Sequence, residues 1–181
     1  LSLAARNDWV SNLPTENNSQ FYPSASVSFL PTSAFDGLKS DALNYLKIRA
    51  GLGTSAGFPS GFPAVNTVDQ STNQNGGAAG GLANTDLKPE LISEFEVGFD
   101  TRLWNNRVSI DFSYFDRSTE DLIVFKPLSP SSGFTFTQAN IGKVEGDGIE
   151  IDMGVDIFQS ESNGFSWNSR LNFTQSEQIV T

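Results

Sequence analysis

Residues 87–123 read LKPELISEFEVGFDTRLWNNRVSIDFSYFDRSTEDLI, and this stretch decides the fold. It predicts a long β-hairpin with Asn105 and Asn106 at the tip, because asparagine tolerates the positive φ angles that a two-residue hairpin turn requires. With this turn, Leu103 pairs with Val108, and the pairing continues outward along both strands.

This register sorts the side chains of the hairpin onto two faces, because successive residues of a strand point to opposite sides. The pairs on one face are apolar: Leu103/Val108, Thr101/Ile110, Phe99/Phe112 and Val97/Tyr114. The pairs on the other face are polar or small: Arg102/Ser109, Asp100/Asp111 and Gly98/Ser113. A slip of one residue would mix the two sets. The hairpin is therefore predicted to be a two-faced ribbon.

The flanking segments show the same alternation of apolar and polar residues. Further strands are predicted at residues 1–9, 21–30, 45–55, 140–158 and 165–174. We also expect one helical turn at 40–46, a short turn at 159–164, and irregular loops at 57–85 and 127–133. With the hairpin, this gives an all-β chain of seven antiparallel strands.

The composition excludes several classes of function. The chain has no Cys and no His, which removes disulfides, thiolate or imidazole metal sites, and Ser-His-Asp or Cys-His catalysis. Its net charge is −10 and it has no Lys/Arg run, so nucleic acid is not an expected partner. We expect no metal, no cofactor and no enzymatic activity.

The lengths of the predicted loops suggest a membrane-spanning barrel. Connections after the first, third and fifth strands are long and polar, and those after the fourth and sixth are short. The connection after the second strand is intermediate and interrupts the pattern. Such asymmetric ends are typical of outer-membrane barrels, whose strands cross the bilayer with about 9–11 residues and need no continuous apolar run. The chain begins at Leu1 without an initiator Met or a secretion signal and ends at Thr181 within an alternating pattern, so we expect a segment of a larger protein.

Two chemical alternatives arise from local patterns. The run GGAAGG at 76–81 could cradle phosphate or form a flexible loop; it lacks the strand-to-helix context and the Lys-Ser/Thr of phosphate loops. Glu150 and Asp152 are two apart on one predicted strand, about 6.6–6.8 Å. That separation overlaps the ~6.5–9.5 Å between the carboxyl groups of inverting glycosidases. Any strand with alternating acids gives the same spacing.

Three stretches carry a resemblance to a known family. Residues 84–123, NTDLKPELISEFEVGFDTRLWNNRVSIDFSYFDRSTEDLI, resemble the barrel of TonB-dependent outer-membrane receptors, and most of all the SusC/RagA-like nutrient importers of Bacteroidota. Residues 6–29, RNDWVSNLPTENNSQFYPSASVSF, resemble a strand-loop-strand of that barrel. Residues 140–155, NIGKVEGDGIEIDMGV, resemble its "N-x-G-x-V-x-x-x-G-I-E" strand.

The resemblance implies an antiparallel up-and-down transmembrane β-barrel of about 22 strands. Residues 1–181 would supply about seven strands of it, without the plug domain, the TonB box or the terminal aromatic residue. The implied location is the outer membrane, and the implied function is import of an oligosaccharide or peptide. The implied partners are outer-membrane lipid, a SusD-like surface lipoprotein, and TonB through parts outside this chain.

Charged residues of one parity are candidates to face the barrel lumen, where they would contact the plug or substrate. They are Lys47, Arg49, Glu94, Glu96, Asp100, Arg102, Asp111, Glu150, Asp152 and Arg170. The alternative is a wall of mutually neutralising charges that faces water. Asp100 opposite Asp111 is unfavourable unless a cation lies nearby. We expect that cation to be Arg102 or a residue of the plug.

Aromatic residues near the strand ends are predicted to form girdles at the two membrane interfaces, where amphipathic rings are favoured. They are Trp9, Phe21, Tyr22, Trp104, Phe115, Phe158 and Trp167. The alternative is ordinary core packing.

A second hypothesis comes from a different class of protein. The chain could be a secreted β-sandwich module that binds carbohydrate. Its apolar faces would then form a dry core between two sheets.

Overall fold

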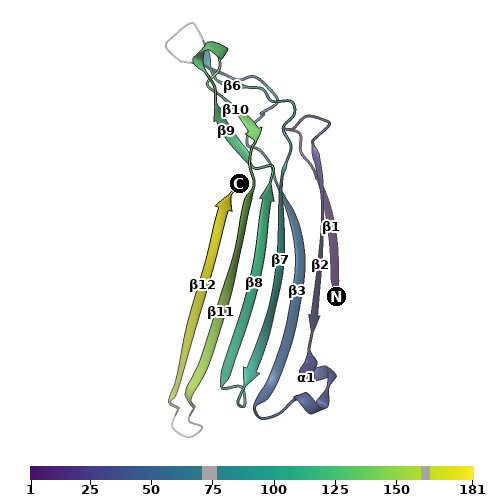
Figure 1. Ribbon diagram of the computed structural model, residues 1–181, viewed down its shortest axis with the longest axis vertical. Helices are drawn as coiled ribbons and strands as arrows, with labels where there is room; N and C mark the ends of the chain where they lie inside the picture. The colour runs from purple at the N-terminus through teal and green to yellow at the C-terminus, as the bar shows by residue number, and fades with distance from the viewer. Residues whose placement is uncertain (71–76, 160–163) are drawn as a thin grey trace.

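The computed structural model describes residues 1–70, 77–159 and 164–181, and its main feature is one curved antiparallel sheet of seven strands (Figure 1). The strands lie in the order β1-β2-β3-β7-β8-β11-β12. Their bounds are β1 Ser2–Trp9, β2 Ser19–Phe29, β3 Leu43–Gly57, β7 Glu90–Leu103, β8 Val108–Glu120, β11 Val144–Gln159 and β12 Ser166–Val180. Because each strand pairs with the next one of the sheet along the chain, the topology is the predicted up-and-down one.

The predicted hairpin is confirmed with its register. β7 and β8 pair from Leu103↔Val108 outward through Asp100↔Asp111. The N–H of Arg107 donates to the carbonyl of Trp104 at 3.2 Å, closing the turn around Asn105 and Asn106, whose φ angles are 57° and 64°. Positive φ at both central residues is the turn that follows the natural twist of a hairpin.

Trp104 also has a positive φ, 52°, which the sequence did not predict. The adjacent β2–β3 connection holds it there: the N–H groups of Trp104 and Asn105 donate to the carbonyls of Ala42 and Asp41, at 3.1 and 3.0 Å. The two neighbouring turns are therefore joined by backbone hydrogen bonds.

The long loops at the opposite end form two small sheets (Figure 1). β6 (Gly81–Leu82), β10 (Phe136–Asn140) and β9 (Ile123–Pro127) form one, next to the 3₁₀ turn η2 (Pro130–Ser132). β4 (Val68–Gln70) and β5 (Gly77–Ala79) form the other. The segments predicted to be irregular thus contain short strands. Gly76 of the glycine-rich run and residues 160–163 of the predicted 159–164 turn lie outside the described residues.

Two predictions about individual elements were wrong. Residues 40–46 form no helical turn; instead α1 (Pro31–Ala34) and the 3₁₀ turn η1 (Asp36–Leu38) precede them, and β3 begins at Leu43. Pro31 explains the shift, because its fixed φ suits the first turn of a helix. The strand predicted at 140–158 is interrupted at Gly142, whose φ of 86° ends β10 before β11 begins.

One face of the sheet is apolar, and its Leu and Phe side chains are unusually exposed. Leu52 is 61% exposed, Leu171 63% and Phe173 46%, and among the described residues Leu13 and Leu87 are the buried apolar side chains. A surface of this kind needs an apolar neighbour. The β-sandwich hypothesis was wrong, because in the described part of the chain no second layer covers this face.

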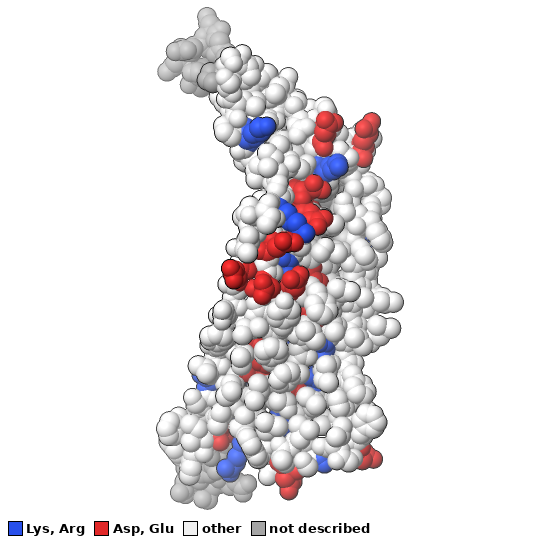
Figure 2. Space-filling model, viewed as in Figure 1, with Lys and Arg blue, Asp and Glu red and all other residues white. Residues whose placement is uncertain are grey.

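A band of acidic residues limits the apolar face toward the long loops. Asp116, Asp147 and Glu177 form one cross-strand row on β8, β11 and β12, on the same face as the apolar rows. Figure 2 shows red side chains gathered near the middle of the molecule, whereas red and blue side chains are scattered singly over the lower half. No helix among the described residues has the length and apolar character needed to cross a membrane.

Candidate functional site

The predicted lumen-facing residues all lie on the face opposite the apolar one. In the cross-strand register, Asp100, Asp111 and Asp152 form one row, with Lys47 at one end and Asn172 at the other. Neighbouring strands lie about 4.8 Å apart, so this row places three carboxylates side by side. The sheet thereby gathers charges from residues more than a hundred positions apart in sequence.

Arg49 lies at the centre of this polar face and links three strands. Its guanidinium donates from Nη2 to Asp111 Oδ1 at 2.6 Å and to Ser113 Oγ at 2.6 Å, and from Nε to Glu96 Oε1 at 3.3 Å. The hydroxyl of Ser113 donates in turn to Glu96 Oε1 at 3.0 Å. We call Arg49, Glu96, Asp111 and Ser113 the Arg49 cluster.

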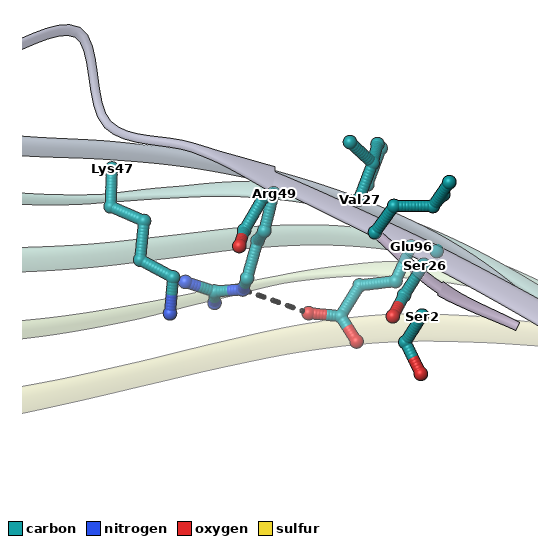
Figure 3. A pocket seen from close by; sticks show the side chains of 10 residues that line it. Ser2, Ser26, Val27, Lys47, Arg49 and Glu96 are labelled. Atoms are coloured by element: carbon teal, nitrogen blue, oxygen red, sulfur yellow. Dashed lines mark hydrogen bonds and ion pairs between the residues drawn. The ribbon is translucent and has the colours of Figure 1, made fainter. Parts of the chain in front are cut away.

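Figure 3 shows how the two faces diverge at this position. Arg49, Lys47 and Glu96 extend to one side of the ribbon together with Ser2 and Ser26, and Val27 extends to the other. Arg49 is only 26% exposed, whereas its acidic partners are 43–45% exposed. The cluster is therefore a partly desolvated, hydrogen-bonded charge group in which two acids share one cation.

Gly98 makes the reach of Arg49 possible. It lies on β7 between Arg49 of β3 and Ser113 of β8, in the same row. A Cβ at this position would lie 3.1 Å from the Arg49 guanidinium carbon and 2.4 Å from the carbonyl oxygen of Phe112. The absence of a side chain lets Arg49 cross over β7 to Asp111. Sequence reasoning placed Gly98 and Ser113 on this face but did not include them among the candidate site residues. A glycine directly across from an arginine, with a serine beyond it in the same row, is the signal that could have identified them.

The cation near Asp111 was predicted to be Arg102 or a plug residue, and the prediction of Arg102 was wrong. Arg102 instead places its guanidinium 5.5 Å from the centre of the Tyr45 ring, on the polar face. Arg49 binds Asp111 because it approaches diagonally across Gly98. Asp100 faces Lys47 in the register, and within the described part of the chain it has no ion pair.

Two further charge groups extend the polar face. Arg117 on β8 donates from Nε to Glu94 of β7 at 2.6 Å. Asp152 on β11 accepts from the amide of Asn172 and lies 3.6 Å from Nε of Arg170, both on β12. These contacts engage Asp152 in cross-strand bonds, which does not favour its use with Glu150 as a catalytic pair. Among the described residues, no group of three or more acids is arranged to hold a metal ion.

The aromatic residues predicted to lie at the interfaces divide between the faces. Trp9 and Phe21 share the apolar face at the long-loop end. Phe158 joins Trp167 on the apolar face at the other end, because a bulge between Asp156 and Phe158 shifts its parity. Trp104, on the adjacent turn, is 59% exposed.

Tyr22 and Phe115 do not fit the interface prediction, because both lie on the polar face. The Tyr22 hydroxyl donates to Asp8, which also accepts from Arg6 at 2.7 Å. The Phe115 ring lies over Gly148, where an added Cβ would come within 2.6 Å of it. The strand register determines on which face each of the two residues lies, and the alternation of residues in the sequence would have predicted the same face.

The long-loop end is held together by side chains that bind backbone. Asn140 accepts from the N–H of Lys88 at 2.9 Å and donates to the carbonyls of Lys88, at 2.9 Å, and Asp121, at 2.7 Å. Glu90 accepts from the N–H of Ile123 at 2.6 Å. Leu87, which is fully buried, lies directly beside this junction in the chain. The LKPE and NIG motifs thus meet where the loops leave the sheet.

Lys143 lies directly before β11 and forms two ion pairs near this junction. It binds Glu145 at 2.7 Å and Glu120 at 3.3 Å. The hydrogen bonds to Glu145 and then Glu120 raise the pKa of the Lys143 ammonium group. Because the shift favours the protonated form, the contact is present below the ordinary lysine pKa and is lost only as pH rises through the raised value.

A single sheet with one apolar exposed face, one charged face, short turns at one end and long loops at the other defines part of the wall of a membrane-spanning β-barrel. The family described as TonB dependent receptor-like, beta-barrel, matches residues 1–180. The chain therefore belongs to this family of outer-membrane proteins.

Known relatives agree with this assignment. TonB-dependent receptor P3 of Formosa agariphila is 28% identical over 97% of this chain, and receptor P26 of the same organism is 23% identical over 99%. The match covers 18% and 19% of those receptors, so the chain spans about a fifth of their length.

Solved structures agree as well. The RagAB peptide transporter matches with a TM-score of 0.85 and 26% identity, over 99% of this chain and 20% of that one. RagAB in its 'open-open' state matches with a TM-score of 0.80 and 25% identity over the same shares. The chain is thus similar to one part of the RagAB structures over nearly its whole length. The siderophore receptor PirA from Pseudomonas aeruginosa, at 16% identity and a TM-score of 0.58, shares the fold.

Proposed function

We propose that this chain forms part of the barrel wall of a TonB-dependent, SusC/RagA-like importer that carries an oligopeptide or oligosaccharide across the outer membrane. The observation that carries the proposal is one sheet with an exposed apolar face and an exposed charged face in a chain of this family. The apolar face meets lipid, and the charged face lines the lumen. The edges at β1 and β12 pair with other strands of a larger barrel, because lipid cannot satisfy open strand edges.

The charged face would contribute to transport by binding polar groups through hydrogen bonds and ion pairs. The Arg49 cluster and the Glu94–Arg117 pair offer both donors and acceptors along the wall, and most of these side chains keep part of their surface free. Such a surface contacts a plug domain or a polar cargo without forming covalent bonds. A peptide is the better supported cargo, since the RagAB structures that resemble this chain are named as a peptide transporter and importer.

The long loops are the proposed contact with cargo and with a SusD-like surface lipoprotein. They lie at the end of the sheet away from the short turns, and the junction around Asn140 fixes where they leave it. TonB would act through parts of the receptor outside this chain and supply the energy for transport.

Uptake by intact cells tests the proposal. The parent receptor gene is deleted, and uptake of a peptic digest of casein and of a partial starch hydrolysate is measured with and without a plasmid copy. We expect peptide uptake to fall on deletion, to return with the plasmid, and to stop in cells lacking TonB. Peptide uptake that is unchanged by deletion, with starch fragments lost instead, would assign an oligosaccharide cargo; neither changing would reject import.

A further inference from the structure

The β2–β3 connection is the feature that neither the sequence pattern nor the proposed function explains. It spans residues 30–42 and contains α1 and η1, whereas the β7–β8 turn at the same end uses residues 104–107. Its length interrupts the rule that connections at this end are short. Figure 1 places α1 beside the lower ends of β2 and β3.

The connection folds back onto the apolar face. The ring of Phe35, between α1 and η1, packs edge-on against Phe29 with 6.3 Å between ring centres. Phe29 pairs with Ile48, which pairs with Phe99 in the same apolar cross-strand row. The connection therefore continues the surface that faces lipid and does not turn toward the charged face.

The apolar side chains of the connection remain exposed after this packing. Phe35 is 57% exposed and Leu38 is 45% exposed. A charged residue directly follows each of them in the chain: Asp36 follows Phe35, and Lys39 follows Leu38. Apolar side chains set among charged neighbours at the end of an apolar wall match the boundary between acyl chains and headgroups.

The connection is held in this position at both ends. The Thr32 hydroxyl oxygen accepts from the N–H of Leu46 at 3.1 Å, which replaces a strand partner where β2 has ended. At the other end, Ala42 and Asp41 accept from the N–H groups of the β7–β8 turn. Because hydrogen bonds hold this segment at both ends, Phe35 and Leu38 have a defined position relative to the ends of the strands.

We propose that residues 31–39 are an interfacial membrane anchor, with Phe35 and Leu38 inserted into the phospholipid leaflet at the short-turn end of the barrel. Continuity with the lipid-facing wall through Phe29 selects lipid as the occupant. The anchor would fix the depth and tilt of this side of the barrel. It does not depend on which cargo is imported or on whether import occurs.

Spin-label accessibility tests the anchor. This chain has no Cys, so single cysteines can be introduced in the full receptor, with any cysteines elsewhere replaced, at Phe35→Cys and Leu38→Cys. Matched controls are Gly37→Cys, where an added Cβ meets nothing within 4 Å, and Lys39→Cys. Each variant carries a nitroxide and is reconstituted in phosphatidylcholine vesicles. Collision with oxygen reports lipid, and collision with a water-soluble nickel chelate reports water.

The expected result is a ratio of oxygen to nickel collisions several-fold higher at 35 and 38 than at 37 and 39. Nickel collisions equal to those of the controls would place the two residues in water and overturn the anchor. Low collision rates with both reagents would mean that protein covers them, which also overturns it. Because Phe35→Cys loses the contact with Phe29, a Phe35→Trp variant quenched by brominated lipid provides a second measurement with the aromatic contact retained.

Discussion

At the scale of single residues, the polar face depends on one arginine and one glycine. Arg49 binds acids on two other strands, and it reaches Asp111 across β7 because Gly98 has no side chain. Alternation of side chains predicted which residues share the face. It could not predict this diagonal contact, because a register gives direct neighbours and not the reach of a long side chain.

Replacing Arg49 with Met should destabilise the receptor by leaving Glu96 and Asp111 without their cation. Breaking a buried pair costs about 3–5 kcal/mol, but these acids are partly exposed and screened by water, so we expect about 1–2 kcal/mol. Urea unfolding of the reconstituted receptor measures the change. Lys47→Met, two positions along the same strand, should change stability by less than about 0.5 kcal/mol, since Lys47 has no ion pair in the described structure. Equal effects of the two variants would contradict the special role of Arg49.

Replacing Gly98 with Ala should lower the unfolding free energy by about 1–3 kcal/mol, the usual cost of overpacking. The new methyl group would collide with the Phe112 carbonyl and with Arg49. Gly53→Ala is the matched control on the same face, because an added Cβ there meets nothing within 4 Å. We expect it to be neutral or stabilising, since alanine lowers the entropy of the unfolded chain. If both alanines destabilise alike, sheet geometry and not the path of Arg49 explains Gly98.

At the scale of elements, the β7–β8 hairpin was predictable because its evidence is local. The Asn-Asn turn and the alternating faces specify the register together, and the structure confirms it. The β2–β3 connection was predicted less well: its helical turn begins at Pro31 and not at residue 40. The positive φ of Trp104 was not predictable, because it depends on backbone hydrogen bonds between the β7–β8 turn and this connection. The strand predicted across Gly142 is interrupted because this glycine has a φ of 86°. Beside it, the N–H of Ile141 donates to the carbonyl of Leu122 at 2.8 Å, a contact that the alternation of residues does not predict.

Replacing Asn106 with Val should weaken the hairpin, because a β-branched residue is strained at a φ of 64°. The left-handed conformation costs an ordinary residue about 1–2 kcal/mol. Asn106→Gly should be neutral or slightly stabilising, since glycine adopts this conformation freely. The fraction of receptor that resists unfolding in SDS before heating measures both. A Val variant that is as resistant as the parent would show that the turn does not limit stability.

At the scale of the whole molecule, the sheet and the loop end are stabilised in different ways. The sheet is stabilised by pairing between neighbouring strands, and lipid would cover its apolar face. At the loop end, Leu13 and Leu87 are buried, and the Asn140 side chain binds the backbone of neighbouring segments. Sequence reasoning identified the NIG motif as a family feature but missed that its asparagine binds Lys88 and Asp121.

Replacing Asn140 with Ala should loosen the loop junction without changing the wall. Hydrogen exchange of the intact receptor should speed up about tenfold or more at the Lys88 amide, because it loses its acceptor, while amides in the centre of β8 and β11 keep their rates. Asn7→Ala is the control, as Asn7 makes no side-chain hydrogen bond in the described structure. Unchanged exchange at Lys88 would mean that other contacts hold the junction.

The junction around Asn140 has an evolutionary consequence. It clamps the roots of the loops, so that the segments beyond it can lengthen, shorten or change composition while the strands below keep their alignment. Receptors with the same barrel could thus evolve to bind new cargo through changes in the loops alone. The loops and the strands would then evolve at different rates.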